Sequence, residues 1–391
     1  MSPRHTRRRG TLTATAATLV TLCAAQTLTA APSATAAPAP DRAAVHAAHS
    51  HSATASAVTA AQDRAARAIA RSLGDAAWST RLRTAALKSP EVPVTERASG
   101  PLKSRLAAAD REIAEAKGLN TKTGSLLRLR LGDRSMRASL SAGTAPWVAA
   151  TVSDDDATTV TAYDSQGRAH RLDARKAPAR PVYVVDIDSS KALAAGLDVL
   201  REELVKDGVQ SAAPGTVNTS ATPKAAANAG FWTTKITAVE LSDDEEPWIK
   251  GAAEIYTLVS GFGQDGKVRV DPVDMPYLDY DGTVYRPNQI LVNWSNYKYN
   301  LADAVMMEED GSTNYRDLAK AIAAVLLTIT DQGAYIPLVN AILDAIPNDW
   351  WTDDPDYVDS WYTLAQSNKG TYYGARGNGW MTVEPYFVQQ L

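Results

Sequence analysis

The aromatic side chains of this 391-residue chain are concentrated in its C-terminal part, and this distribution limits how it can fold more than any other feature. Of the 27 Trp, Tyr and Phe residues, 23 lie in residues 231–391. Charge divides at the same place. Residues 231–391 carry 24 acidic and 10 basic residues, a net of −14, whereas residues 1–230 carry 20 and 30, a net of +10. Two such compositions in one chain predict two separate units.

The first 36 residues have the order of features typical of a secretory signal peptide. Four arginines within the first nine residues are followed by an uncharged apolar stretch, residues 11–31, and then by the small residues Ala34, Thr35 and Ala36. This order predicts cleavage near Ala36 and a secreted, extracellular protein. Thr and Gln interrupt the apolar stretch, so it does not predict a stable membrane span.

The single cysteine restricts how an exported chain can be stabilised. Cys23 lies within the predicted signal peptide, so the mature chain has no cysteine left to form a disulfide. An exported protein without disulfides must be held together by an ordinary hydrophobic core or by a metal ion.

The N-terminal half changes its pattern several times. Residues 37–60 are low in complexity and predict a disordered leader. Residues 61–210 then form a basic helical and β-rich region, and the Pro/Ser/Thr/Ala-rich residues 211–229 predict a linker. Within 61–210, 3.6-residue periodicity predicts helices and β-rich runs predict strands. The helices are expected at 61–75, 76–89, 101–119 and 197–209, and the strands at 126–131, 147–152, 158–164 and 181–188.

The C-terminal unit, residues 230–391, combines strands with two apolar helices. A hairpin with Asp281-Gly282 as its turn is expected at 276–286. The fold class we predict is α+β, with N-terminal helices and a small β-rich region before a C2-like β-sandwich that contains an inserted helical hairpin. The strands are expected at 234–241, 253–262, 289–294, 356–364 and 379–388, and the helical hairpin at 315–346. Residues 356–364 could equally form a helix, since Asp354-Pro355 is a good N-cap and N1 pair.

Several chemistries are excluded by the residues that are missing. None of the five histidines lies beyond His170, so the C-terminal unit cannot hold a Ser-His-Asp or Cys-His system. Without Cys or His there, no zinc site is expected. The sequence also has no nucleotide-binding loop, and no redox cofactor is expected. The acidic half would repel phosphates and the basic half lacks an aromatic platform, so no nucleic-acid partner is expected.

Acidic residues gather in four segments that flank the predicted strands. A calcium ion takes six to eight oxygen ligands, which carboxylates from separate loops can supply. The alternative is ordinary solvated loops that keep the protein soluble. If calcium is bound, the candidate ligands are Asp243, Asp244, Glu254, Glu309, Asp310, Asp353 and Asp354.

Tryptophan supplies a second candidate site. Trp350 and Trp351 stand among Asn and Asp residues, so exposure of at least one indole ring is expected. Exposed Trp beside carboxylates suits glycan binding, and two carboxylates at the right separation would make a glycosidase. For the other Trp residues, packing in the core is the simpler explanation.

Three stretches resemble a known family. These are PWIKGAAEIYTLVSGF (247–262), NWSNYKYNLADAVMMEEDGSTNY (293–315) and DWWTDDPDYVDSWYTL (349–364). Together they resemble an uncharacterised family of exported bacterial proteins, known only as a domain of unknown function. The resemblance implies export and a shared fold, and it implies no activity.

The sequence therefore predicts a secreted, non-catalytic binding protein for an extracellular ligand, either a glycan or a protein, with calcium in its inter-strand loops. The alternative is a secreted enzyme that acts on polysaccharide through paired carboxylates. A third hypothesis is that the basic N-terminal helices act as a pro-segment for the acidic unit.

Overall fold

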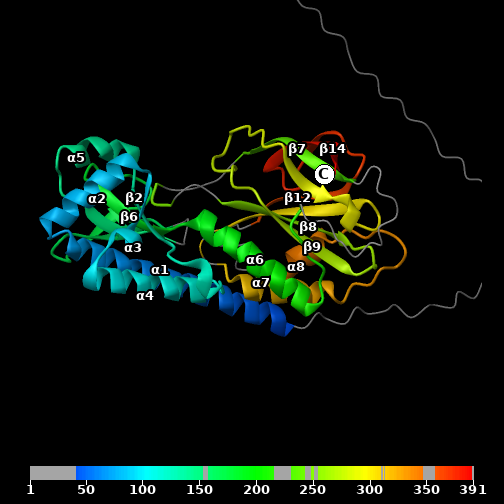
Figure 1. The fold of residues 1–391 in the computed structure, drawn as a ribbon, viewed down its shortest axis with the longest axis horizontal. Helices are drawn as coiled ribbons and strands as arrows, with labels where there is room; N and C mark the ends of the chain where they lie inside the picture. Colours follow the sequence, from blue (N-terminus) through cyan, green and yellow to red (C-terminus); the bar gives the residue numbers. More distant parts are fainter. Residues whose placement is uncertain are drawn as a thin grey trace, which may run out of the picture. The chain divides into compact units, whose positions relative to one another are not determined.

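The computed structural model describes residues 41–152, 157–214, 230–242, 248–250, 254–309, 311, 313–346 and 357–389, with side chains from residue 54 onward. Residues Pro40–Leu391 form one compact unit. The predicted signal peptide, residues 1–36, and most of the predicted linker lie outside the described residues. The fold is α+β, as the sequence predicts, and Figure 1 shows helices and a mixed sheet interleaved in the N-terminal half, followed by the strands of a β-sandwich.

Helices make up most of the N-terminal half. The first begins at Asp41, so residues 41–60 are helical, which differs from the disordered leader expected there. The physical reason is that Ala-rich sequence favours a helix, and Val58 and Ala61 are buried in the core. The helices of this half are α1 (Asp41–Ser72), α2 (Ala76–Lys88), α3 (Val94–Arg97), α4 (Gly100–Ala116), α5 (Arg137–Ser141) and α6 (Ser189–Asp207).

A six-stranded sheet packs against these helices in the order β1-β2-β6-β3-β4-β5. All neighbours are antiparallel except β3 and β6. The alternation in LRLRL places Leu127 and Leu129 in the helix-covered core, and Asp110 of α4 accepts the Leu126 and Leu127 N–H groups at 2.7 Å. The strands are β1 (Glu91–Pro93), β2 (Leu127–Leu131), β3 (Trp147–Ala150), β4 (Thr159–Tyr163), β5 (Ala169–Asp173) and β6 (Val182–Ile187).

Eight further strands form two four-stranded antiparallel sheets, which we call the outer sheet, β10-β7-β14-β13, and the inner sheet, β12-β11-β8-β9. One hydrophobic cluster is built from both sheets, for example Val239 and Met381 from the outer and Val259 and Trp361 from the inner, so they pack face to face. The strands are β7 (Gly230–Leu241), β8 (Ile255–Phe262), β9 (Val268–Asp274), β10 (Gln289–Asn293), β11 (Leu301–Glu308), β12 (Tyr357–Ala365), β13 (Gly370–Tyr373) and β14 (Gly379–Gln389).

Two parts of this region differ from the sequence prediction. Strands β9, β11 and β13 are additional to the predicted ones. The hairpin predicted at 276–286 is wrong: these residues form turns, and only Tyr285 makes a bridge, to Val239 of β7. The C2-like strand arrangement stays a prediction.

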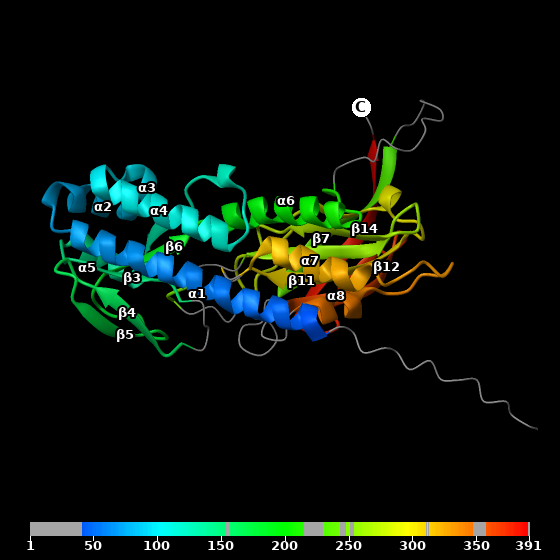
Figure 2. The same ribbon diagram turned by 90° about the horizontal axis from the view of Figure 1, so that it is seen from below.

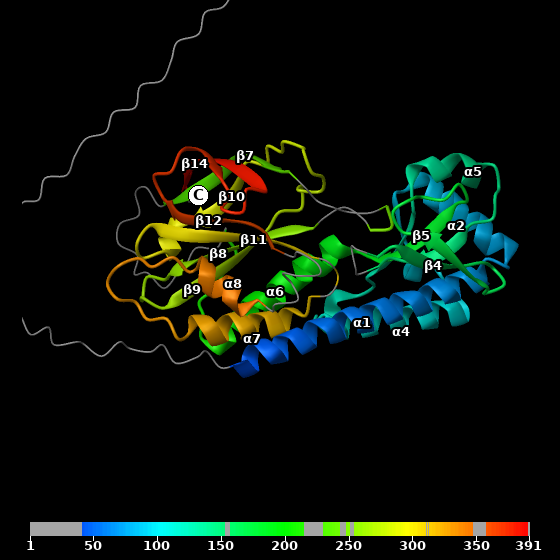
Figure 3. The ribbon, with the colours of Figure 1, turned by 180° about the vertical axis from the view of Figure 1, so that it is seen from behind.

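Helices cover the second face of the inner sheet. The predicted helical hairpin is present between β11 and β12 as α7 (Tyr315–Leu326) and α8 (Val339–Ala345), and α6 packs on β9 and α7. Figures 2 and 3 show α6, α7 and α8 together along this face. Among the described residues, no helix is long and apolar enough to cross a bilayer.

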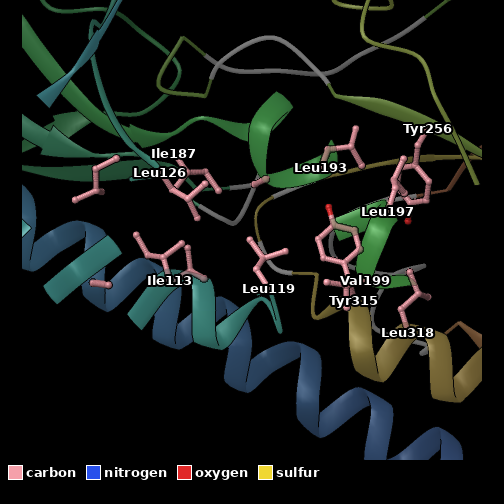
Figure 4. Packing of buried hydrophobic residues seen from close by; sticks show 14 of the residues in the cluster. Ile113, Leu119, Leu126, Ile187, Leu193, Leu197, Val199, Tyr256, Tyr315 and Leu318 are labelled. Atoms are coloured by element: carbon pink, nitrogen blue, oxygen red, sulfur yellow. The ribbon is translucent and has the colours of Figure 1, made fainter. Parts of the chain in front are cut away.

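A single hydrophobic core runs from the N-terminal sheet to the inner sheet. Figure 4 shows Ile113 and Leu126 at one end of it and Tyr256 and Tyr315 at the other. The predicted domain boundary at 211–229 stays a prediction, but the core includes side chains from both sides of it. A β-carbon on Gly196 of α6 would stand 2.2 Å from the Tyr315 ring, so glycine is required for this close approach.

A buried ion pair joins the two halves. The Lys117 ammonium, at the end of α4, contacts the Glu309 carboxylate, just after β11, and both side chains are 0% exposed. Glu309 also accepts hydrogen bonds from the Tyr315 hydroxyl and, at 2.9 Å, from the Gly311 N–H. Each charge is therefore compensated inside the core, which is the condition for burying it.

We predict that Lys117→Met lowers the free energy of unfolding by about 3–5 kcal/mol, because it leaves the buried Glu309 carboxylate without its cation. The double variant Lys117→Met/Glu309→Gln should recover part of this loss, since a neutral amide needs no cation beside it. Urea unfolding of the mature chain measures both. Lys122→Met, an exposed position, is the control. A Lys117→Met protein as stable as this control would contradict the prediction.

Candidate functional site

The four predicted acidic segments flank strand ends that lie together at one end of the sandwich. Glu308 of β11 pairs with Ile255 of β8, and Met307 pairs with Tyr357 at the start of β12. β7 ends at Leu241 beside Gly379, and Asp359 near the start of β12 accepts the Gly379 N–H, so β7 ends at the same end of the sandwich. We call this the acidic end. Most of the candidate residues themselves lie outside the described residues, namely Asp243, Asp244, Asp310, Asp353 and Asp354, as do Trp350 and Trp351.

The two candidate ligands that the structure describes point to different uses. Glu309 is buried in the ion pair with Lys117, so its carboxylate already has a cation. Glu254 is half-exposed, and its carbonyl accepts the Glu309 N–H at 2.9 Å. Within the described part of the chain, no group of three or more His, Cys, Asp or Glu side chains is placed to hold a metal. Whether calcium binds at the acidic end stays a prediction.

Asp359, which belongs to the last acidic segment, has a structural role. It is fully buried in β12 and accepts four backbone N–H groups. Its Oδ1 takes those of Ser360 and Arg376 at 2.8 Å, and its Oδ2 takes those of Asn378 and Gly379 at 2.8 and 2.9 Å. These four hydrogen bonds hold the β13–β14 turn against β12, and they engage both oxygens of the Asp359 carboxylate.

The opposite end of the sandwich opens into a groove of about 540 Å³. Trp232 of β7 and Pro385 of β14 line it from the outer sheet, and Leu301 of β11 and Ala365 of β12 line it from the inner sheet. The groove thus lies where the two sheets part, and we call it the Trp232 groove. The residues lining it are Trp232, Tyr299, Asn300, Leu301, Ala365, Gln366, Ser367 and Pro385.

Among the eight described residues that line the groove, Trp232 is the one large hydrophobic residue that is exposed. It is 47% exposed, although large apolar side chains are usually covered. Its cross-strand partner is Phe387 of β14, whose ring meets it edge-on at 5.3 Å. The T-shaped contact fixes the ring without covering its whole surface.

Three polar side chains in the groove have no hydrogen-bond partner among the described residues: Asn300, Gln366 and Ser367. Asn300 has a left-handed backbone, with φ of 51°, and its carbonyl accepts the Gln366 N–H at 3.1 Å. The backbone bond joins the two segments, while both side-chain amides stay available as donors and acceptors.

Tyr299 is held by contacts on both its ring and its hydroxyl. Its ring packs edge-on against Phe262 and Tyr335 at 6.2 and 6.3 Å, and its hydroxyl donates to Asp331 at 2.5 Å. Asp331 also pairs with the Lys298 ammonium. The loop between α7 and α8, which carries Asp331, therefore positions one wall of the groove.

Sequence reasoning did not select these residues. Trp232 was one of seven C-terminal tryptophans, most of them expected to lie in the core, and nothing local distinguishes it. The groove is assembled from four separate segments of the chain, so no spacing in the sequence marks it.

The fold and the groove define an α+β protein with an antiparallel sandwich, helices on one face and a candidate binding groove at one end. The family model described as "Protein of unknown function (DUF3103)" matches residues 60–391, so the chain belongs to this family. The match confirms the predicted resemblance to an uncharacterised family and includes the N-terminal helices, while export stays a prediction. No curated protein and no solved structure matches the chain.

The Asp331 contacts predict a pH effect. Hydrogen bonds from the Lys298 ammonium, the Tyr299 hydroxyl and the Gly333 N–H lower the pKa of Asp331 to about 2. A folded-state pKa below the unfolded value of about 4 means that the ionised group stabilises the fold above pH 4. This contribution is lost as the pH falls from about 4 to about 2.

Asp331→Asn should therefore melt below the wild type at pH 7, and the difference should shrink between about pH 4 and about pH 2. Thermal unfolding of both proteins across this range measures it. Asp265→Asn, on the exposed β8–β9 turn, is the control. A difference that is constant over the whole pH range would contradict the role of Asp331.

Proposed function

We propose that this protein is exported and acts as a non-catalytic binding protein, with a glycan seated in the Trp232 groove. The observation that carries the proposal is the composition of this groove, in which an exposed indole faces solvent beside amide and hydroxyl groups without partners among the described residues. Binding sites commonly combine apolar surface with a few polar groups that fix orientation.

A glycan fits this combination better than an apolar ligand does. A sugar ring has a C–H face that can lie on the Trp232 indole, and hydroxyl groups at its edge that both donate and accept hydrogen bonds. The amides of Asn300 and Gln366 offer both kinds of group. An apolar ligand would leave them unpaired, at a cost of about 1–3 kcal/mol for each buried group.

The enzyme alternative requires two carboxylates across the bound sugar, about 5–10 Å apart. Of the eight described residues that line the groove, none is Asp or Glu. Hydrolysis at this groove would therefore need acidic groups from elsewhere, and binding without turnover is the function the geometry favours. Export rests on the signal-like N-terminus.

The test is titration of the mature chain with a panel of soluble neutral oligosaccharides, followed by calorimetry. Trp232→Ala should raise the Kd of the bound oligosaccharide at least about ten-fold, since a central aromatic contact is worth about 2 kcal/mol. Tyr373→Ala, which removes an exposed aromatic residue from β13, is the matched control and should bind like the wild type.

Equal binding by Trp232→Ala and wild type, or no binding across the panel, would refute a glycan site in this groove. New reducing ends in the titrated oligosaccharide would refute the non-catalytic part and favour the enzyme.

A second candidate function is calcium binding at the acidic end. The observation that favours it is the strand register, which brings the segments flanking all four acidic groups to one end of the sandwich. Because Glu309 is engaged with Lys117, the proposed ligands come from Asp243, Asp244, Glu254, Asp310, Asp353 and Asp354.

Millimolar calcium should then raise the melting temperature above its value in EDTA by several degrees, because a ligand bound only by the folded state stabilises it. The variant Asp243→Asn/Asp353→Asn should lose this rise, and Asp265→Asn should keep it. No calcium-specific rise in the wild type would leave the acidic end as solvated surface.

A further inference from the structure

Positive side chains gather at one end of the N-terminal sheet. β4 runs antiparallel to both β3 and β5, with Tyr163 opposite Val148 and Ala169, so β3 begins, β4 ends and β5 begins at the same sheet end. Figure 2 shows these three strands side by side. We call this the basic sheet end, and its cations are Arg71, Arg83, Arg168, His170 when protonated, and Arg180.

Two arginines reach the basic sheet end from other elements, Arg71 from α1 and Arg83 from α2, and their close contacts show where they lie. A β-carbon on Gly167, in the β4–β5 turn, would stand 3.0 Å from Arg71 Nε, and one on Gly143, before β3, would stand 3.6 Å from Arg83 Nη1. Arg180 donates to the Ala145 carbonyl at 2.9 Å. Arg71 and Arg83 have no acidic partner among the described residues, so their charges are not neutralised there.

The acidic groups at this end are already engaged. Asp164 accepts the Arg168 guanidinium at 2.8 Å and contacts His170 Nε2 at 3.2 Å. Asp63 of α1 pairs with Arg67 at 2.8 Å and accepts the Tyr163 hydroxyl at 2.7 Å. The sheet end therefore keeps a positive balance.

The chain between β3 and β4 contains the acidic run Asp154–Asp156. The described residues next to this run lie away from the basic sheet end. The described residues on either side of the run, Val152 and Ala157, follow the end of β3 and precede the start of β4. By the same register, they lie at the opposite end of the sheet.

The ring of Trp147 contacts two side chains of the basic sheet end. The His170 ring stacks on it at 4.0 Å with an interplanar angle of 7°, and the Arg180 guanidinium carbon lies 4.9 Å from its centre. These contacts use ring surface on which a nucleic-acid base or a sugar would have to stack. What this end offers is fixed guanidinium N–H donors.

We propose that the basic sheet end binds a linear polymer that carries phosphate or sulfate groups. Arginine presents planar paired donors that match tetrahedral oxyanions, and four arginines at one sheet end suit repeated anionic groups. A membrane surface fits less well, because no large apolar side chain is exposed between residues 54 and 204 of the described chain.

The test measures the affinity of the mature chain against salt concentration for two soluble probes, polyphosphate and a sulfated polysaccharide, with phosphatidylglycerol vesicles and single-stranded DNA as comparison ligands. Log affinity should fall linearly with log salt as counterions are released. The triple variant Arg71→Gln/Arg83→Gln/Arg180→Gln should bind more weakly and lose roughly one unit of slope for each arginine that contacts the polymer. The two probes tell phosphate recognition from sulfate recognition.

The matched control is Arg105→Gln/Arg111→Gln/Lys122→Gln, which makes the same charge change at exposed residues of α4 and the turn after it. It should bind like the wild type, and both triple variants are compared only if they melt at the wild-type temperature. If one of the three substitutions at the basic sheet end prevents folding, the double variant with the other two substitutions is compared with the double control Arg105→Gln/Arg111→Gln.

Four results would overturn the proposal. Binding to neither polymer nor vesicles would leave the basic sheet end without a ligand. Equal loss in both triple variants would show a diffuse charge effect. Binding to phosphatidylglycerol vesicles but to neither polymer would make the partner a membrane. A base-dependent preference for single-stranded DNA over polyphosphate would make it a nucleic acid.

Discussion

The inner sheet is buried on both faces, and the rest of the structure depends on that burial. Every residue of β8 from Ile255 to Phe262 is buried, with Val259 facing the outer sheet and Leu258 facing the helices. An antiparallel sheet usually has one face in solvent, so apolar and polar residues alternate along its strands. The strands of a sheet that is covered on both faces are almost continuously apolar. The helices of the N-terminal half therefore complete the sandwich, because without α6 the sheet would expose a large apolar face.

Polar groups at the margins of this sheet are buried only where local partners satisfy them. Glu309 has Lys117 and Tyr315, and Asp303 of β11 accepts the Leu338 and Thr363 N–H groups at 2.5 and 2.7 Å. The Asp303 contacts tie α8 and β12 to the same strand. Removing one partner leaves the other uncompensated in the core, so these contacts fix which helix and which strand pack together as well as stabilising them.

Elements whose pattern is local could be predicted from the sequence, and those decided by distant contacts could not. The alternation of LRLRL and the apolar run of 253–262 predict strands near the correct bounds, and the apolarity of 315–346 predicts the α7–α8 hairpin. Strand β9 was missed because Pro272 argues against a strand, yet β9 is an edge strand, where proline is tolerated. The Trp232 groove could not be predicted, since its two walls come from sheets that meet only in the fold.

The positions of the candidate surfaces explain how one chain can carry several without interference. Leu301 and Glu308 are the two ends of β11, so the Trp232 groove and the acidic end lie at opposite ends of the sandwich. Charges separated by more than about 10 Å are largely screened at physiological salt, and a strand of eight residues spans more than that. The glycan site proposed in the groove and the calcium site proposed at the acidic end would therefore influence each other little. The arginines proposed to bind an anionic polymer stand on a third sheet, at the end where β3 and β5 begin.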